Sequence, residues 1–136
     1  KELAETQTVG DTTVAELPSF KARVADLESQ IMAMEFTELR IFSALSAGRN
    51  VGPESSLLKC RGTELQQAVT ELAVDALGTY SAPFLEDPLA DTNEPPIGPA
   101  NAHTVTPHYL SMRKASIYAG SNEIQRNIMA KAVLGL

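Results

Sequence analysis

The stretch PSFKARVADLESQIMAMEFTELRIFSALSAG, residues 18–48, decides the fold class. Apolar side chains recur in it at alternating steps of four and three residues, at Phe20, Val24, Leu27, Ile31, Met34, Ile41 and Leu45. This spacing is typical of an α-helix that presents one apolar face to partner helices. Pro18 suits the first turn and Gly48 the position after the last one, so we expect a helix from Leu17 to Ala47. Glu38 interrupts the face, either as a functional carboxylate or, as is commoner, as an edge residue paired with an arginine.

A second helix is predicted from Pro53 to Leu77, with Gly78 after its end. Its apolar face carries Leu58, Leu65, Val69, Leu72 and Ala76. Gly62 interrupts a run of strong helix formers at a cost of about 1 kcal/mol relative to alanine, and a glycine there would let a neighbouring helix approach closely. The linker Ser46–Gly52 is short, so the two helices should be antiparallel neighbours.

A proline-rich segment follows the second helix. Six of the eight prolines lie between residues 78 and 107, where no helical period is visible. We therefore expect an extended loop over residues 79–106 that wraps the helices or contacts a neighbouring subunit. Helix should resume from Pro107 to Tyr118, with Thr106 as its N-cap.

The last helix is predicted from Asn122 to Val133. Ser121 is a suitable N-cap, Gly135 a suitable stop, and the residues expected to face inward are Ile124, Ile128 and Met129. No segment of useful length alternates between apolar and polar residues. The fold class expected from these patterns is all-α, an antiparallel bundle of the four-helix type.

Composition excludes several classes of function. The chain has 136 residues, with Lys+Arg 11 against Asp+Glu 17, and its net charge of -6 argues against binding of nucleic acid. No apolar run approaches the roughly 20 residues that a membrane-spanning helix needs. One cysteine and two separated histidines do not provide a metal site, and a single cysteine favours a reducing, cytoplasmic setting.

One local feature could carry chemistry. Ala119 and Gly120, the smallest side chains, separate two predicted helices, and the second helix begins directly after them. Backbone N–H groups at such a helix N-terminus carry positive partial charge and can meet an oxygen-rich ligand. A plain helix–turn–helix corner with a serine cap explains the same residues.

The segment Tyr118-Ala119-Gly120-Ser121-Asn122-Glu123-Ile124-Gln125-Arg126-Asn127-Ile128, continued by residues 130–136, resembles the C-terminal end of acyl-CoA dehydrogenases. The stretches Ser56–Lys59, Arg61–Gln67 and Thr70–Ala73 resemble the preceding helix of many bacterial members. The resemblance implies that residues 17–136 are most of the C-terminal helical domain of a longer flavoenzyme. Residues 1–16 are then a remnant of the preceding helix and a linker.

The resemblance also implies a reaction and a site. The family removes an α-proton from an acyl-CoA thioester with a carboxylate, while FAD takes a hydride from the β-carbon. In many members the carboxylate follows the motif's tyrosine, and here that position is Ala119, so no catalytic residue is expected in this chain. The Ala119 amide and Tyr118 are the implied substrate contacts, and Gly120, Ser121 and Glu123 are the implied cofactor contacts.

Two departures from the family pattern point to a divergent subfamily. The stretch Val9–Val14 has no basic residue where relatives often carry one toward a neighbouring subunit's FAD. Gly78-Thr79-Tyr80 leads into the proline-rich loop where relatives often have a glycine-rich turn.

Three interpretations remain open at this point: a domain of an active dehydrogenase whose base lies outside the chain, a catalytically inert partner subunit, and an unrelated helical assembly module. The resemblance implies a homo-oligomer, dimer or tetramer, and FAD that is bound by the complete protein but not by this segment alone.

Overall fold

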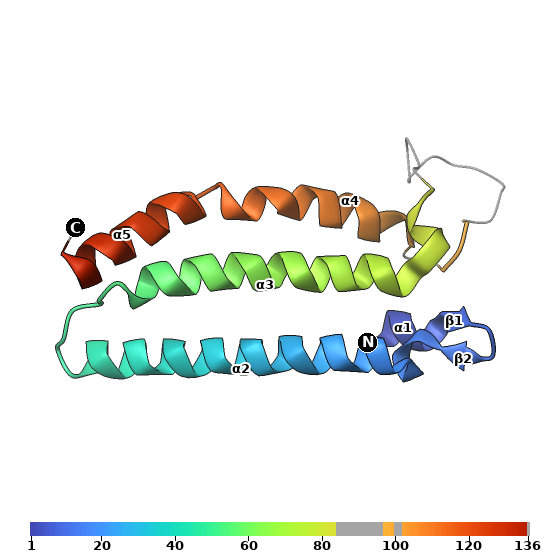
Figure 1. The fold of residues 1–136 in the computed structure, drawn as a ribbon, viewed down its shortest axis with the longest axis horizontal. Coiled ribbons are helices and arrows are strands. Elements are labelled where there is room, and N and C mark those ends of the chain that lie inside the picture. Colours follow the sequence, from blue (N-terminus) through green and yellow to red (C-terminus); the bar gives the residue numbers. More distant parts are fainter. Residues whose placement is uncertain (84–96, 100–101, 136) are drawn as a thin grey trace. The chain divides into compact units, whose positions relative to one another are not determined.

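The computed structural model of the chain describes residues 1–83, 97–99 and 102–135 (Figure 1). The chain divides into two compact units. The first comprises Lys1–Val24 and Ala68–Arg113, and the second comprises Ala25–Gln67 and Lys114–Leu136. The helices α2 and α3 each contribute residues to both units, and the units are described separately below.

Helices dominate the described residues, which confirms the all-α class. In chain order the elements are α1 (Glu2–Thr6), β1 (Thr8–Val9), β2 (Thr12–Thr13), the 3-10 helix η1 (Val14–Glu16), α2 (Pro18–Ser46), α3 (Glu54–Leu77), η2 (Gly78–Ser81), α4 (Ala102–Met112), η3 (Arg113–Ser116) and α5 (Asn122–Leu134). The two strands form one short antiparallel hairpin, with Thr8 opposite Thr13. None of the described helices is long and apolar enough to cross a membrane.

The ends of α2, α3 and α5 lie within one or two residues of the predicted positions. Gly48, Gly78 and Gly135 adopt the left-handed conformation just beyond these helices, with φ of 74°, 55° and 70°. Glycine adopts this conformation without a side-chain clash, which is why it marks helix ends so reliably.

The first unit has its core where α1, η1 and the ends of α2 and α3 meet. Ala4, Val14 and Ala76 are buried there, with Leu3 and Phe20 packed against them. Arg23 near the start of α2 forms ion pairs with Asp75 and Glu71 near the end of α3. These contacts make the two helices antiparallel neighbours in this unit, as the short linker predicts.

The prediction for α4 was wrong at both ends. The helix begins at Ala102 and includes Pro107, and it tightens into η3 after Met112. Thr106 is not the N-cap because it lies inside α4, and its hydroxyl donates to the Ser81 carbonyl at 2.8 Å. Pro107 is the sixth residue of α4 and lies beyond its first turn, so its missing N–H removes one intrahelical hydrogen bond. Most of the loop expected over residues 79–106 lies outside the described residues.

The inward faces of the helices were predicted only in part. Most of the predicted α2 face is half-buried, although no α2 residue is fully buried. Four residues predicted to face inward are instead largely exposed: Leu45, Val69, Ile124 and Ile128. The buried face of α3 carries small and polar side chains, which a search for large apolar residues overlooks: Ser56, Cys60, Thr63 and Thr70.

A second apolar stripe on α2 was not predicted. Large side chains with exposed fractions of 56–62% follow each other at helical spacing, at Met32, Phe36, Leu39 and Phe42. We call these residues the exposed α2 stripe. Apolar surface gathered in this way is typical of an interaction face.

Candidate functional site

The site predicted from the motif is the turn between η3 and α5, in the second unit. Ile117 and Tyr118 both donate their amide N–H groups to the Lys114 carbonyl, at 2.9 and 3.2 Å, and the chain then reverses into α5. Ala119 and Gly120 have φ of 54° and 85°. Ala119 is the one residue other than glycine with positive φ in the described part of the chain. An L-residue in this conformation costs roughly 1–2 kcal/mol, so the surroundings must hold it there.

The backbone amides of this turn are available to a ligand. The N–H groups of Ala119 and Gly120 have no hydrogen-bond partner within residues 1–83, 97–99 and 102–135, and both residues are exposed. They precede the N-terminus of α5, where the helix dipole adds positive partial charge. Tyr118 is 47% exposed on the same turn. The arrangement can donate hydrogen bonds to a carbonyl or anionic oxygen.

Ser121 is the N-cap of α5, as predicted. Its side-chain oxygen accepts a hydrogen bond from the Ile124 amide at 3.5 Å. Glu123 is fully exposed in the first turn, and the pKa of its carboxyl is lowered, chiefly by a hydrogen bond from its own backbone amide and next by one from the Ser121 hydroxyl. The structure therefore gives these two predicted cofactor contacts a local capping role.

Gly120 has two reasons to be glycine. Its φ of 85° disfavours any side chain, and a Cβ built there would lie 2.7 Å from Nε2 of Gln125. The amide of Gln125 thus lies directly against the turn. A larger residue at this position has to displace Gln125 and strain the backbone.

The residues that support the turn from α3 were not predicted from the sequence. Asn122, the first residue of α5, is only 4% exposed, and its side chain bonds with Lys59 and Thr63. Glu64 of α3 forms an ion pair with Arg126 of α5 at 2.7 Å. These partners are about 60 residues apart in the chain, and no local pattern indicates such pairings.

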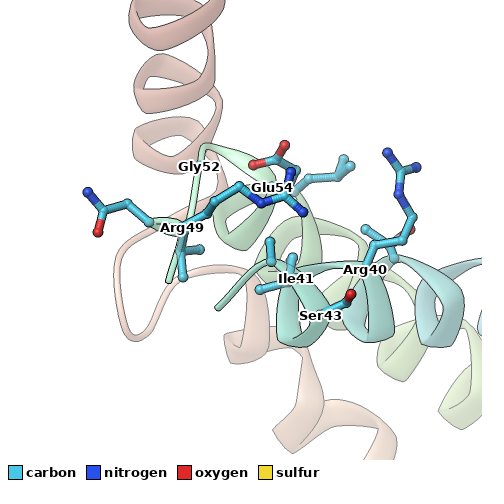
Figure 2. A pocket seen from close by; sticks show the side chains of 11 residues that line it. Arg40, Ile41, Ser43, Arg49, Gly52 and Glu54 are labelled. Atoms are coloured by element: carbon cyan, nitrogen blue, oxygen red, sulfur yellow. The ribbon is translucent and has the colours of Figure 1, made fainter. Parts of the chain in front are cut away.

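A separate hollow of about 510 Å³ lies at the connection between α2 and α3 (Figure 2). Arg40 and Ser43 of α2, Arg49 and Gly52 of the linker, and Glu54 of α3 are among its lining residues. Neither arginine forms an ion pair with any carboxylate of the described chain. No residue of the 117–123 segment lines the hollow, so it is distinct from the turn.

One of the comparisons with known proteins shows the family, and another shows the fold. The model of the acyl-CoA dehydrogenase C-terminal domain matches residues 1–134. A comparison with curated protein sequences gives no match. Among solved structures, the three-dimensional structure of butyryl-CoA dehydrogenase from Megasphaera elsdenii superposes with a TM-score of 0.72 at 20% identity. The superposition covers 98% of this chain but only 30% of that one, so the chain spans less than a third of the length of this relative. Since the family model covers nearly every residue, the chain belongs to the acyl-CoA dehydrogenase family and has the fold of its helical C-terminal domain.

Proposed function

We propose that the chain is the C-terminal domain of an FAD-dependent enzyme that introduces an α,β double bond into acyl-CoA thioesters. The observation that carries this proposal is the left-handed turn at Ala119 and Gly120, whose exposed amides have no hydrogen-bond partner among the described residues and lie in front of α5. Family membership supports this class of reaction and argues against an unrelated helical assembly module.

In this proposal the Ala119 amide donates to the thioester carbonyl, next to Tyr118. Removal of the α-proton moves negative charge onto that oxygen, and a fixed N–H donor stabilises the charge as it develops. FAD, when bound, accepts the hydride from the β-carbon. Ala119 has no ionisable side chain, so in this proposal the base that takes the α-proton lies outside the chain.

The fit of the flavin-facing residues is partial. Gly120 has no side chain, although the Gln125 side chain lies against it, and the Ser121 oxygen lies at the start of α5. The Ser121 hydroxyl also bonds Glu123, however, so a flavin contact has to replace that bond. A carboxylate repels a pyrophosphate, so Glu123 suits a ribose or adenine donor better.

A second candidate function is a catalytically inert partner subunit of such an enzyme. The observation that favours it is Ala119 itself, since the position that holds the carboxylate in many relatives carries a methyl group here.

In both candidates the domain forms a homo-oligomer, dimer or tetramer. The exposed α2 stripe supports this assembly because its large side chains are left uncovered. The free thiol of Cys60 suits the reducing cytoplasm.

The test is to express a complete protein that ends in this domain, record its flavin absorbance, and add acyl-CoA thioesters from short to long chain length. Bound flavin that is bleached by a thioester supports the active enzyme. Bound flavin that no thioester bleaches supports the inert partner. A folded protein that takes up no FAD contradicts both candidates.

A further inference from the structure

We propose that Lys59 is a positioning residue, whose ammonium group joins the two ends of the 117–121 turn and thereby fixes the direction of the Ala119 amide. The functional consequence rests on the function proposed above, but the geometry does not. Lys59 lies on α3, far from the turn in sequence, and its side chain is part-buried.

The three contacts of Lys59 span the turn. Its Nζ donates to the Ala115 carbonyl at 3.4 Å and to the Ser116 carbonyl at 3.5 Å, at the end of η3. It also donates to Oδ1 of Asn122 at 2.8 Å, at the start of α5. An ammonium group has three N–H donors, and each has an acceptor here. Residues 117–121 therefore connect two positions, Ser116 and Asn122, that are both bonded to Lys59.

The Asn122 end of this bridge is fixed by further bonds to α3. The Asn122 side-chain amide donates to the Thr63 hydroxyl at 3.1 Å, and that hydroxyl lies 2.9 Å from the Cys60 carbonyl, to which it donates. The Cys60 thiol donates to the Asn122 backbone carbonyl at 3.6 Å. With Lys59 on Oδ1, the polar atoms of the Asn122 side chain are satisfied, and the residue is 4% exposed.

Electrostatics explains why a lysine suits this position. The last carbonyls of η3 carry negative partial charge, and a cation near such carbonyls is favourable. Lys59 also lowers the pKa of the nearby Glu123 carboxyl, although local hydrogen bonds lower it more. The alternative is that Lys59 merely adds stability to the contact between α3 and α5, without controlling the turn.

The turn depends on such external support because its own bonds are few. Beyond the Ile117 and Tyr118 amides, which bond to Lys114, no backbone hydrogen bond within the described chain involves the amides of Ala119 or Gly120. Ala119 nevertheless holds φ at 54°. When the two ends of so short a segment are fixed, few backbone conformations can connect them, and the left-handed pair is the one observed.

The test uses the isotope-labelled chain and the variant Lys59→Met, which keeps the apolar stem and removes the ammonium group. The control is Lys114→Met, which removes the same charge from an exposed side chain beside the turn. The measurement is NMR of the couplings and chemical shifts that report φ at Ala119. We expect Lys59→Met to lose the positive-φ signature while the amides of α3 and α5 stay protected, and Lys114→Met to keep it. An unchanged Ala119 in Lys59→Met overturns the proposal.

If Lys59→Met fails to fold, Asn122→Ser provides the test, since its shorter side chain cannot reach Lys59, and the same loss at Ala119 is expected. Kinetics of a complete flavoprotein separates this inference from the proposed function. Lys59→Met should lower kcat by about 10²-fold with little change in KM, because misplacement of a donor by about 1 Å has effects of that size. A moved Ala119 with unchanged kcat would refute the carbonyl contact, and the positioning role of Lys59 would stand.

Discussion

Replacing Gly62 by alanine should stabilise the chain, whereas the same replacement at Gly120 should destabilise it. Gly62 lies inside α3, and a Cβ built there would be 3.6 Å from the Met34 sulfur, an ordinary van der Waals distance. Alanine therefore fits, and it removes conformational freedom that glycine has in the unfolded chain. This is worth about 0.5–1 kcal/mol. The close helix approach that would require glycine at this position is not present.

At Gly120 the balance is reversed. With φ at 85°, alanine costs roughly 1–2 kcal/mol in backbone strain. Its Cβ would also lie 2.7 Å from Nε2 of Gln125, whose flexible side chain has to move. The two variants should therefore differ by about 1.5–3 kcal/mol in free energy of unfolding, although the chemical change is the same.

Urea denaturation followed by far-ultraviolet circular dichroism measures this difference directly. If the free energy of unfolding falls with urea at the same slope in both variants, the difference between them is a difference in stability and not in the compactness of the unfolded state. A Gly120→Ala variant as stable as the parent would refute the left-handed turn. A destabilised Gly62→Ala variant would show that the space beside Met34 is not free.

Three further predictions concern packing, ionisation and assembly. Leu65 is 5% exposed, so Leu65→Ala should lower the free energy of unfolding by about 2–4 kcal/mol. Val69 is 46% exposed, so Val69→Ala should lower it by well under ~1 kcal/mol in the same urea assay. Similar losses in the two variants would contradict the observed buried face of α3. In an NMR titration, the pKa of the Glu123 carboxyl should lie below its ordinary value. The stability that the ionised carboxylate contributes is therefore complete above the ordinary pKa and is lost as the pH falls through the lowered pKa. Ser121→Ala should raise the pKa of Glu123 back toward its ordinary value, and an unchanged pKa would contradict the hydrogen bond from Ser121. Phe36→Glu, in the exposed α2 stripe, should shift sedimentation at micromolar concentration toward the monomer while leaving helicity unchanged, whereas a parent chain that is already monomeric would contradict the proposed assembly.

Local signals predicted the helix ends well and the helix faces less well. Gly48, Gly78 and Ser121 act through their own backbone or side chain, so their effects can be derived from sequence alone. Pro107 was misread because proline is favoured in the first turn of a helix, whereas here it lies inside α4 and one intrahelical hydrogen bond is lost. The face of α3 was partly misread because small and polar side chains fill its buried positions.

The candidate turn itself was predicted, and its support was not. The residues of the motif are contiguous, so their spacing could be recognised directly. Lys59 and Asn122 meet only because α3 and α5 pack together, and each residue taken alone is an unremarkable polar position on a helix. Pairings of this kind depend on tertiary structure, which periodicity does not contain.

Because Cys60 is buried, the rate at which its thiol is labelled can be used to measure local opening of the structure around it. It is the only cysteine in the sequence, its side chain is 3% exposed, and its thiol bonds the backbone of Asn122 at the start of α5. A thiol reagent can reach the sulfur only when the residues around Cys60 open, and the bonded start of α5 is one of them. When closing is faster than labelling, the rate of labelling under native conditions divided by the rate for a free thiol gives the fraction of molecules in which the surroundings of Cys60 are open.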